Sequence, residues 1–264
     1  MNAPESLGYT AAQIRAAERP LLEAGVPLMR RAAAGLAGEL TRLLAERTSD
    51  RPARVLLLVG SGDNGGDTLF AGAELAAGGA HVVALSTGSR VHETGAAAAR
   101  AAGVEILSED EADARVAELV GAADVLVDGI LGIGGAGSPA LRGRAREIVA
   151  RIRPLLEAEN APLVVAVDVP SGIDADDGSL PDPTVLPADV TVTFGALKAG
   201  LLHSPGAELA GELILIDIGL NPDSRSSSAT PSRSSSAAPS RSSSATPSRS
   251  SSAKRVSRPQ DARE

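Results

Sequence analysis

A five-residue apolar run followed by a glycine-rich loop constrains this sequence more than any other stretch. Residues 55–59 read Val-Leu-Leu-Leu-Val, and a run without polar alternation is typical of a strand covered on both faces in a parallel sheet. Residues 60–67 read Gly-Ser-Gly-Asp-Asn-Gly-Gly-Asp, and the glycines let the backbone turn sharply and approach a ligand closely. The residues that follow are helix-like. The loop is therefore predicted to lie at a helix N-terminus, where free N–H groups suit an anion such as a pyrophosphate.

Strand-like and helix-like segments alternate after this motif. Strands are expected at 81–85, 104–107, 125–127, 163–167, 190–194 and 213–216, and helices around 93–102 and 140–156. The alternation predicts one α/β domain with a three-layer, Rossmann-like α/β/α architecture and a mostly parallel sheet. Ahead of the motif, Thr10 is expected to open a first helix that Pro20 ends, and Pro27 to lie in the first turn of a second helix.

The composition changes abruptly near the C-terminus. A Ser-Arg-Ser-Ser-Ser-Ala unit recurs with a period of eight from Ser224 onward. A unit this short and polar cannot bury a face, so the segment is expected to be disordered. The predicted organisation is a folded domain over residues 1–222 and a disordered Ser/Arg/Pro-rich tail over residues 223–264.

Composition and charge disfavour several classes of protein. The tail holds eight Lys and Arg against three Asp and Glu; because the whole chain carries −8, residues 1–222 carry −13, which disfavours nucleic-acid binding. No run of 18 apolar residues indicates a membrane span, and residues 1–6 lack the features of a secretory signal. The absence of cysteine fits a reducing compartment, so a cytoplasmic protein is expected.

Acidic residues directly follow two of the predicted strands. Asp128 follows residues 125–127, and Asp168 follows residues 163–167. Ligands of open α/β sheets bind outside the carboxyl ends of the strands, so Asp67, Asp128 and Asp168 are expected to converge there. For any single one of them, the alternative is a residue that only caps a loop.

Oxygen-bearing side chains near these acids suit a metal ion. Asn64, Asp128 and Ser171 offer one carboxylate and neutral oxygens, which favours a monovalent hard cation over a catalytic divalent ion. Zinc is disfavoured, because cysteine is absent and the three histidines have no ligand spacing.

The glycines at positions 60, 62 and 65 match the dinucleotide-binding fingerprint in form. That fingerprint also requires an acidic residue about 20 positions further on, and residues 85–90 contain none. An ordinary nicotinamide oxidoreductase is therefore disfavoured.

Three motifs in this order resemble the epimerase domain of the NAD(P)H-hydrate epimerase family. They are the loop at 60–67, Val-Asp-Gly-Ile-Leu-Gly at 127–132, and Val-Asp-Val-Pro-Ser-Gly-Ile-Asp at 167–174, and the likeness extends over most of residues 9–220. The resemblance implies an isomerase that interconverts the R and S forms of NADH or NADPH hydrated at C6. A separate dehydratase would then restore the cofactor from the S form.

The resemblance also implies roles for particular residues. Potassium would be held by Asn64, Asp128 and Ser171, and Asp168 is expected to be the acid–base catalyst and to stabilise the cationic intermediate electrostatically. The implied substrate contacts are Asp63, Asn64, Gly65, Gly66, Asp67, Gly132, Ile133, Gly134, Gly135, Ala136, Gly137, Ser138 and Asp168.

The sequence departs from the family pattern at three positions. Asp63 stands where the family usually has Asn, which adds negative charge beside a pyrophosphate unless a cation or Lys198 offsets it. Gly129 replaces a common Ala, and Thr68 replaces a common Gly.

The resemblance leaves alternatives and partners open. Related domains in decapping-enhancer proteins resemble this fold without being enzymes, so a non-catalytic nucleotide- or RNA-linked scaffold is the competing interpretation. The joint presence of Asp67, Asp128 and Asp168 favours the enzyme. The expected partners are hydrated NADH or NADPH and a dehydratase in trans, because nothing after Leu220 is predicted to form that domain; a homodimer is left open.

Overall fold

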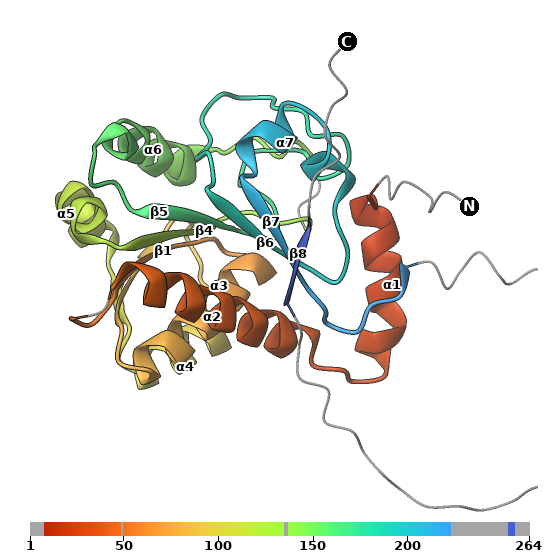
Figure 1. The fold of residues 1–264 in the computed structure, drawn as a ribbon, viewed down its shortest axis with the longest axis horizontal. Helices are drawn as coiled ribbons and strands as arrows, with labels where there is room; N and C mark the ends of the chain where they lie inside the picture. The colour runs from red at the N-terminus through yellow and green to blue at the C-terminus, as the bar shows by residue number, and fades with distance from the viewer. Residues whose placement is uncertain (1–7, 49, 135–136, 223–252, 257–264) are drawn as a thin grey trace, which may run out of the picture.

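A mostly parallel β-sheet forms the centre of the molecule (Figure 1). The computed structural model describes residues 8–48, 50–134, 137–222 and 253–256. The strand order is β3-β2-β1-β4-β5-β6-β7-β8, and only β8 is antiparallel to its neighbour. The strands are β1 (Arg54–Val59), β2 (His81–Ser86), β3 (Glu105–Leu107), β4 (Val125–Gly129), β5 (Leu163–Val167), β6 (Val190–Phe194), β7 (Glu212–Ile216) and β8 (Ala253–Val256).

Helices cover both faces of this sheet, which confirms the predicted three-layer architecture. The α-helices are α1 (Ala11–Glu23), α2 (Leu28–Arg47), α3 (Asp63–Ala77), α4 (Glu93–Ala101), α5 (Glu109–Ala122), α6 (Gly143–Ile152) and α7 (Gly206–Leu209). Two short 3-10 helices are η1 (Arg153–Glu157) and η2 (Ala199–Leu201). Helices α2, α3 and α4 pack on one face, and α5 and α6 on the other (Figure 1). In the part of the chain that is described, no helix combines the length and apolarity needed to cross a bilayer.

Alternate side chains of β1 belong to two different cores. Val55, Leu57 and Val59 are buried against α2, α3 and α4, whereas Leu56 and Leu58 are buried against α5 and α6. Because successive side chains of a strand point to opposite faces, a strand covered on both sides needs apolar residues at every position. The unbroken apolar run in the sequence has this cause.

Helix α1 extends further than its sequence predicted. Thr10 caps it as expected, with its side chain accepting from the Gln13 N–H. The prediction that Pro20 ends the helix is wrong, because α1 continues to Glu23 and the Ala24 N–H still bonds the Pro20 carbonyl at 3.1 Å. Proline has no N–H to donate to the carbonyl one turn earlier in the helix. Because Pro20 is exposed, water can hydrate that carbonyl instead.

Strand β8 lies within the segment that was predicted to be a disordered tail. For residues 253–256 that prediction is wrong, since they pair with β7 from Leu213↔Val256 to Ile216↔Ala253. The outer edge of β7 offers unpaired backbone groups, and Arg255 adds an ion pair with Glu212 at 2.8 Å. The remainder of the predicted tail lies outside the described residues, and the boundary at residue 222 stays a prediction.

The order of the strands determines where a ligand can bind. The chain leaves β1 through β2 and β3 on one side and then returns to place β4 on the other side of β1. The loops after β1 and β4 therefore meet at a topological switch point, where the Gly60 N–H donates to the Gly129 carbonyl at 3.0 Å. Doubly wound sheets bind their ligands in the crevice at such a point.

Two departures from the family pattern meet beside this switch point. A Cβ on Gly129 would lie 1.9 Å from Thr68 Oγ1 and 2.8 Å from Thr68 Cβ, too close for the two side chains to coexist. Thr68 is fully buried, and its hydroxyl donates to the Asn64 carbonyl at 2.7 Å. Gly129 therefore provides the space that the Thr68 side chain occupies.

Gly129→Ala is expected to destabilise the protein by about 1–3 kcal/mol, because the new methyl group overpacks against Thr68. Thr68→Gly in the same chain removes the clash, so the double variant is expected to lose less than the two single losses added together. Urea denaturation measures all three free energies of unfolding. Gly38→Ala, where a Cβ meets no atom within 4 Å, is the control. Additive losses would contradict the pairing.

Candidate active site

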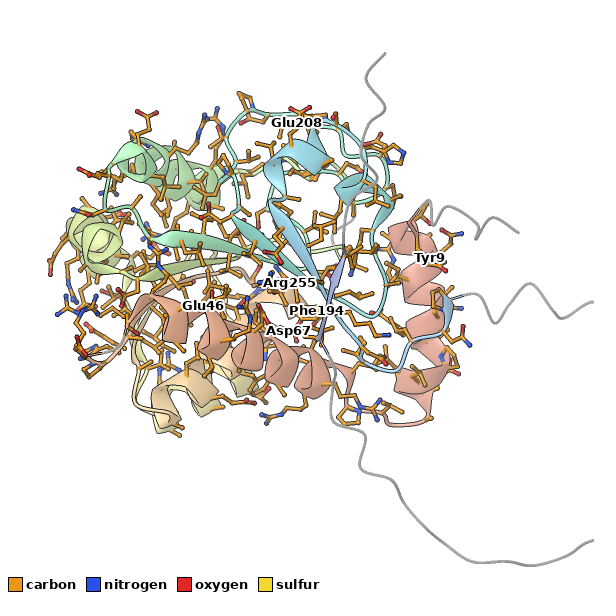
Figure 2. The ribbon with its side chains drawn as sticks, in the orientation of Figure 1. Tyr9, Glu46, Asp67, Phe194, Glu208 and Arg255 are labelled. Carbon is orange, nitrogen blue, oxygen red and sulfur yellow. The ribbon has the colours of Figure 1, made fainter. Side chains whose placement is uncertain are left out.

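A cavity of about 970 Å³ lies at the carboxyl ends of the parallel strands. Its walls come from α1, α2 and the start of α3, and from the loops that follow β1, β2 and β4 together with residues at the ends of β5 and β6. Figure 2 labels Asp67, from α3, and Phe194, the last residue of β6, which both line it. As predicted, loops that are far apart in the sequence meet at this edge of the sheet.

The glycine-rich loop leads directly into α3. Gly62 is the N-cap and offers no side chain to the first turn, so backbone N–H groups stay available at the cavity. Asp63, Asn64 and Asp67 line the cavity. Gly65 does not, because it packs against the β1 loop: a Cβ there would lie 2.0 Å from the Gly60 carbonyl oxygen. Its absence of a side chain lets the helix start close to the strand.

The second glycine-rich loop contributes less to the cavity than expected. Gly132, Ile133 and Gly134 line it, and the Ile133 carbonyl accepts from Arg15 of α1 at 2.6 Å. Gly137 and Ser138 of this loop do not line the cavity, and Ser138 Oγ instead accepts from the Ala140 N–H at 3.3 Å. Gly66 of the first glycine-rich loop does not line it either. Of the predicted substrate contacts, Gly135 and Ala136 lie outside the described residues.

Asp168 is held in a strained conformation at the floor of the cavity. Its φ of 68° is the only left-handed value of a non-glycine residue in the described chain, and such strain is typical of functional positions. Its Oδ1 accepts from the Lys198 ammonium, from Thr193 Oγ1 at 3.3 Å and from the Phe194 N–H at 3.4 Å. No hydrogen bond of the described residues engages Oδ2. One carboxylate oxygen is therefore anchored and the other is left for a ligand.

Lys198 has a central role in the site that the sequence analysis did not predict. Only 1% of it is exposed, and its ammonium donates to Asp168 Oδ1, to Thr193 Oγ1 at 2.9 Å and to the Phe194 carbonyl at 2.9 Å. Its backbone neighbours bind the N-terminal segment, since Tyr9 bonds Leu197 and Ala199 at 2.8 and 3.0 Å. The signal in the sequence was a lone lysine among small and apolar residues.

Asp67 lies in the second turn of α3 and is 8% exposed. Burial raises its pKa well above the usual value, and the negative charges of Asp168, Asp63 and Glu18 raise it further against an opposing effect of Lys198. Glu18, half-buried on α1, also has a raised pKa, chiefly because of burial. The cavity thus concentrates carboxyl groups around one lysine.

The predicted metal ligands lie together just beneath the cavity floor. Asp128 accepts from Ser171 Oγ at 2.7 Å and from the Ser171 N–H at 2.9 Å. Asn64 Nδ2 donates to the carbonyls of Leu131 and Val167 at 2.9 and 3.1 Å, and Ser171 Oγ accepts from the Leu131 N–H at 2.8 Å. Asn64 lines the cavity, whereas Asp128 and Ser171 are buried below it.

Asp128 is a buried carboxyl group whose hydrogen-bond partners are all neutral. It is 1% exposed, burial raises its pKa, and the Ser171 and Ile130 hydrogen bonds oppose that effect without supplying positive charge. A fully buried carboxylate is costly unless a cation compensates it. The set of Asn64, Asp128 and Ser171 offers one carboxylate and neutral oxygens. This chemistry fits a monovalent cation.

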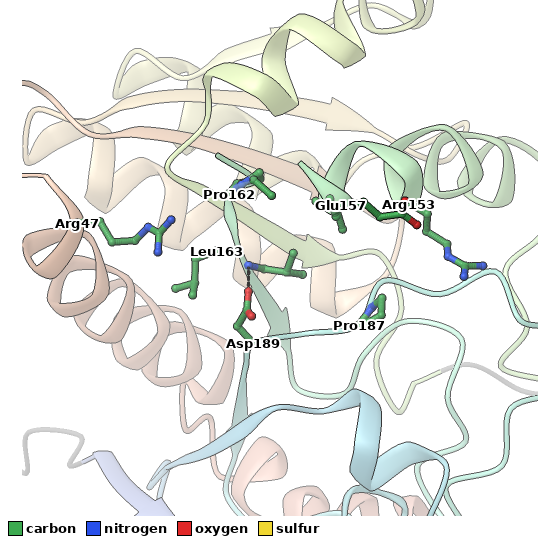
Figure 3. A pocket seen from close by; sticks show the side chains of 10 residues that line it. Arg47, Arg153, Glu157, Pro162, Leu163, Pro187 and Asp189 are labelled. Atoms are coloured by element: carbon green, nitrogen blue, oxygen red, sulfur yellow. Dashed lines mark hydrogen bonds between the residues drawn. The ribbon is translucent and has the colours of Figure 1, made fainter. Parts of the chain in front are cut away.

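A second, smaller cavity of about 450 Å³ opens at the amino ends of β5 and β6 (Figure 3). Arg47 and Arg153 line it, and Asp189 uses its carboxylate to accept from the Val164 N–H at 2.8 Å (Figure 3). None of the predicted site residues lies there. The carboxyl-end cavity is lined by seven of them, which are Asp63, Asn64, Asp67, Gly132, Ile133, Gly134 and Asp168.

Known proteins resemble this chain in sequence and in fold. The family described as YjeF-related protein N-terminus matches residues 25–200. The NAD(P)H-hydrate epimerase of Clavibacter michiganensis subsp. michiganensis is 56% identical over 225 residues, which cover 85% of this chain and 94% of that protein. The NAD(P)H-hydrate epimerase of Microbacterium testaceum is 50% identical over 214 residues, 81% of this chain and 79% of that protein.

Two further relatives differ in length or in sequence. The bifunctional NAD(P)H-hydrate repair enzyme Nnr of Mycobacterium tuberculosis is 43% identical over 221 residues, which cover 81% of this chain but 41% of that enzyme. The crystal structure of the yeast protein ynu0 superposes with a TM-score of 0.66 at 22% identity, covering 78% of this chain and 86% of the yeast chain. That structure supports the fold alone.

Asp67→Asn is expected to stabilise the protein at neutral pH. Because the pKa of Asp67 is raised in the folded state, the folded wild type loses stability as pH rises above about 4, the value of an unfolded aspartate. The amide does not ionise, so the difference in free energy of unfolding should grow from pH 4 towards pH 7 and be constant below pH 4. Urea denaturation across this range measures it. A difference independent of pH would contradict the assignment.

Proposed function

The chain belongs to the NAD(P)H-hydrate epimerase family of YjeF-related N-terminal domains, and we propose that Asp168 carries its reaction. The protein is an isomerase that interconverts the R and S forms of hydrated NADH and NADPH, a step of cofactor repair. The observation that supports the role of Asp168 is its anchored carboxylate, with Oδ1 bound to Lys198 and Oδ2 left for a ligand at the cavity.

The chemistry of the substrate defines what such a carboxylate must do. In the hydrate, C6 carries a hydroxyl beside the ring nitrogen, and once a general acid protonates that hydroxyl, the nitrogen lone pair can expel it as water. A planar iminium cation remains, and water can return to either face. The negative charge of Asp168 stabilises this cation, and its Oδ2 accepts a proton from the returning water.

The rest of the cavity supports binding of a dinucleotide. The uncapped N-terminus of α3 suits the pyrophosphate, and Asp63, Asn64, Asp67 and the loop at 132–134 complete the proposed contacts. Gly65 and Gly66 contribute by letting the start of α3 pack closely against the residues around it. The predicted contacts at 135–138 are kept as a proposal for the loop when substrate is bound.

We further propose that potassium binds at Asn64, Asp128 and Ser171. The support is the buried Asp128 carboxyl group, which has only neutral partners, and the Ser171 hydroxyl that is bonded to it. When bound, the cation would compensate the Asp128 charge and fix the loops after β4 and β5. Asp168 belongs to the second of these loops, so residues that held the ion there would also hold Asp168 in position.

The partners follow from the reaction. Epimerisation only supplies the S form, so a dehydratase in trans must remove the water. The relative from Mycobacterium tuberculosis is named as bifunctional, and this chain matches 41% of it. A homodimer and a cytoplasmic location remain proposals. The relatives named as epimerases favour the enzyme over the non-catalytic scaffold.

Asp168→Asn is expected to slow epimerisation by about 10²–10⁴-fold, because the amide neither accepts the proton nor stabilises a cation. NMR of a single purified hydrate epimer gives the rate as the other epimer forms. Glu118→Gln, an exposed exchange on α5, is the matched control and should keep the wild-type rate. Full activity in a folded Asp168→Asn variant would remove Asp168 from the mechanism.

Replacing potassium by choline at equal ionic strength is expected to lower both the melting temperature and the epimerisation rate, since a ligand of the folded state stabilises it. Ser171→Ala should abolish the difference between the two salts while the protein still folds. Equal melting temperatures of the wild type in potassium and choline would contradict the metal site.

A further inference from the structure

One polar atom of the cavity has no partner. Among the described residues, Asp67 Oδ1 is the only buried side-chain nitrogen or oxygen without a hydrogen bond. Buried polar groups are nearly always paired, and an orphaned one at a cavity indicates a group that a ligand completes. Asp67 lines the cavity that also contains Asp168 and Lys198.

The surroundings of Asp67 favour its neutral form. The charged groups that face it are Asp168 after β5, Asp63 on the same helix, Glu18 on α1 and Lys198 ahead of η2. Three of these four are acidic, and all three N–H groups of the Lys198 ammonium are already bonded to other atoms. None of these four groups is a cation free to pair with Asp67, and burial together with the neighbouring carboxyl groups raises its pKa well above the usual value.

Asp168 and Asp67 thus differ in the way that an acid–base pair requires. Asp168 is bonded to the Lys198 ammonium group. Asp67 has no such partner, and burial and the neighbouring carboxyl groups favour its neutral form. Environments that separate the protonation states of two neighbouring carboxyl groups assign the acid and the base.

We infer that Asp67 is a second catalytic residue, the general acid that protonates the leaving hydroxyl, while Asp168 acts as the base. The inference rests on the proposed function. It assigns to Asp67 a chemical role, whereas the family resemblance made it only one of several substrate contacts.

Each bond and proton in the step is accounted for. The C6–O bond breaks, its electron pair and the Asp67 proton leave with the oxygen as water, and the nitrogen lone pair forms the C=N bond of the iminium. A water molecule then adds to the other face of C6, the C=N pair returns to nitrogen, and the released proton goes to Asp168. The two carboxyl groups have exchanged protonation states, which is the state that catalyses the reverse conversion. Proton exchange with solvent restores the first state.

The kinetic test is Asp67→Asn, which keeps the shape and a hydrogen-bond donor but cannot transfer a proton. The expected loss is about 10²–10⁴-fold in kcat, and the alkaline fall of the wild-type rate, where Asp67 ionises, should be missing from the residual activity. Glu74→Gln, exposed on the same helix, is the control. Wild-type activity, or a slow variant that keeps the alkaline fall, would overturn the inference.

An infrared measurement separates this inference from the proposed function. At pH 7 the wild type without substrate should show the carbonyl stretch of a protonated carboxylic acid, and the difference spectrum against Asp67→Asn should assign it to Asp67. Absence of that band would overturn the inference even in an active enzyme. If the band is present but the wild type does not interconvert the epimers, the proposed function fails while the protonated Asp67 stands.

Discussion

The buried ion pair between Asp168 and Lys198 is the interaction on which the active site depends. Removing one partner of such a pair leaves an uncompensated charge and typically costs about 3–5 kcal/mol. The pair also links distant parts of the chain: Asp168 follows β5, its N–H bonds Val192 of β6, and the residues on both sides of Lys198 bind Tyr9. Tyr9 directly precedes the cap of α1, the helix that forms a wall of the cavity. The ion pair therefore links the central sheet to the helix that forms a wall of the cavity.

The excess of carboxyl groups around Lys198 has a thermodynamic cost that function explains. Asp67 and Glu18 both have raised pKa values, and each ionisable group forced toward its neutral form reduces the stability of the folded state at neutral pH. A pocket selected for stability alone would not gather these groups. A reaction through a cationic intermediate benefits from them, because negative charge that is already in place needs no reorganisation when the cation forms. The proposed site of the pyrophosphate is the N-terminus of α3.

Local patterns in the sequence predicted most of the fold, and long-range contacts account for what they missed. The apolar run of β1, Asp128 near the end of β4 and Asp168 after β5 could be recognised because strand burial and strand ends leave local signatures. Strand β8 was missed because only the open edge of β7 makes a polar tail segment pair. The importance of Lys198 was equally hidden. A lysine 30 residues from Asp168 has no spacing signature, and its role exists only once β6 brings the two side chains together.

The contact between Thr68 and Gly129 restricts the order in which this active site can change during evolution. The family pattern has Gly at position 68 and Ala at position 129. The present chain has the larger Thr side chain on the helix and a glycine, which has no side chain, on the strand. Because a Cβ at position 129 collides with the Thr68 hydroxyl, a lineage passing between the two pairs avoids the Thr–Ala combination. The open route runs through two glycines, with a small void beside Asp128 as its intermediate. The two substitutions are therefore epistatic, because one packing contact determines which combinations are tolerated.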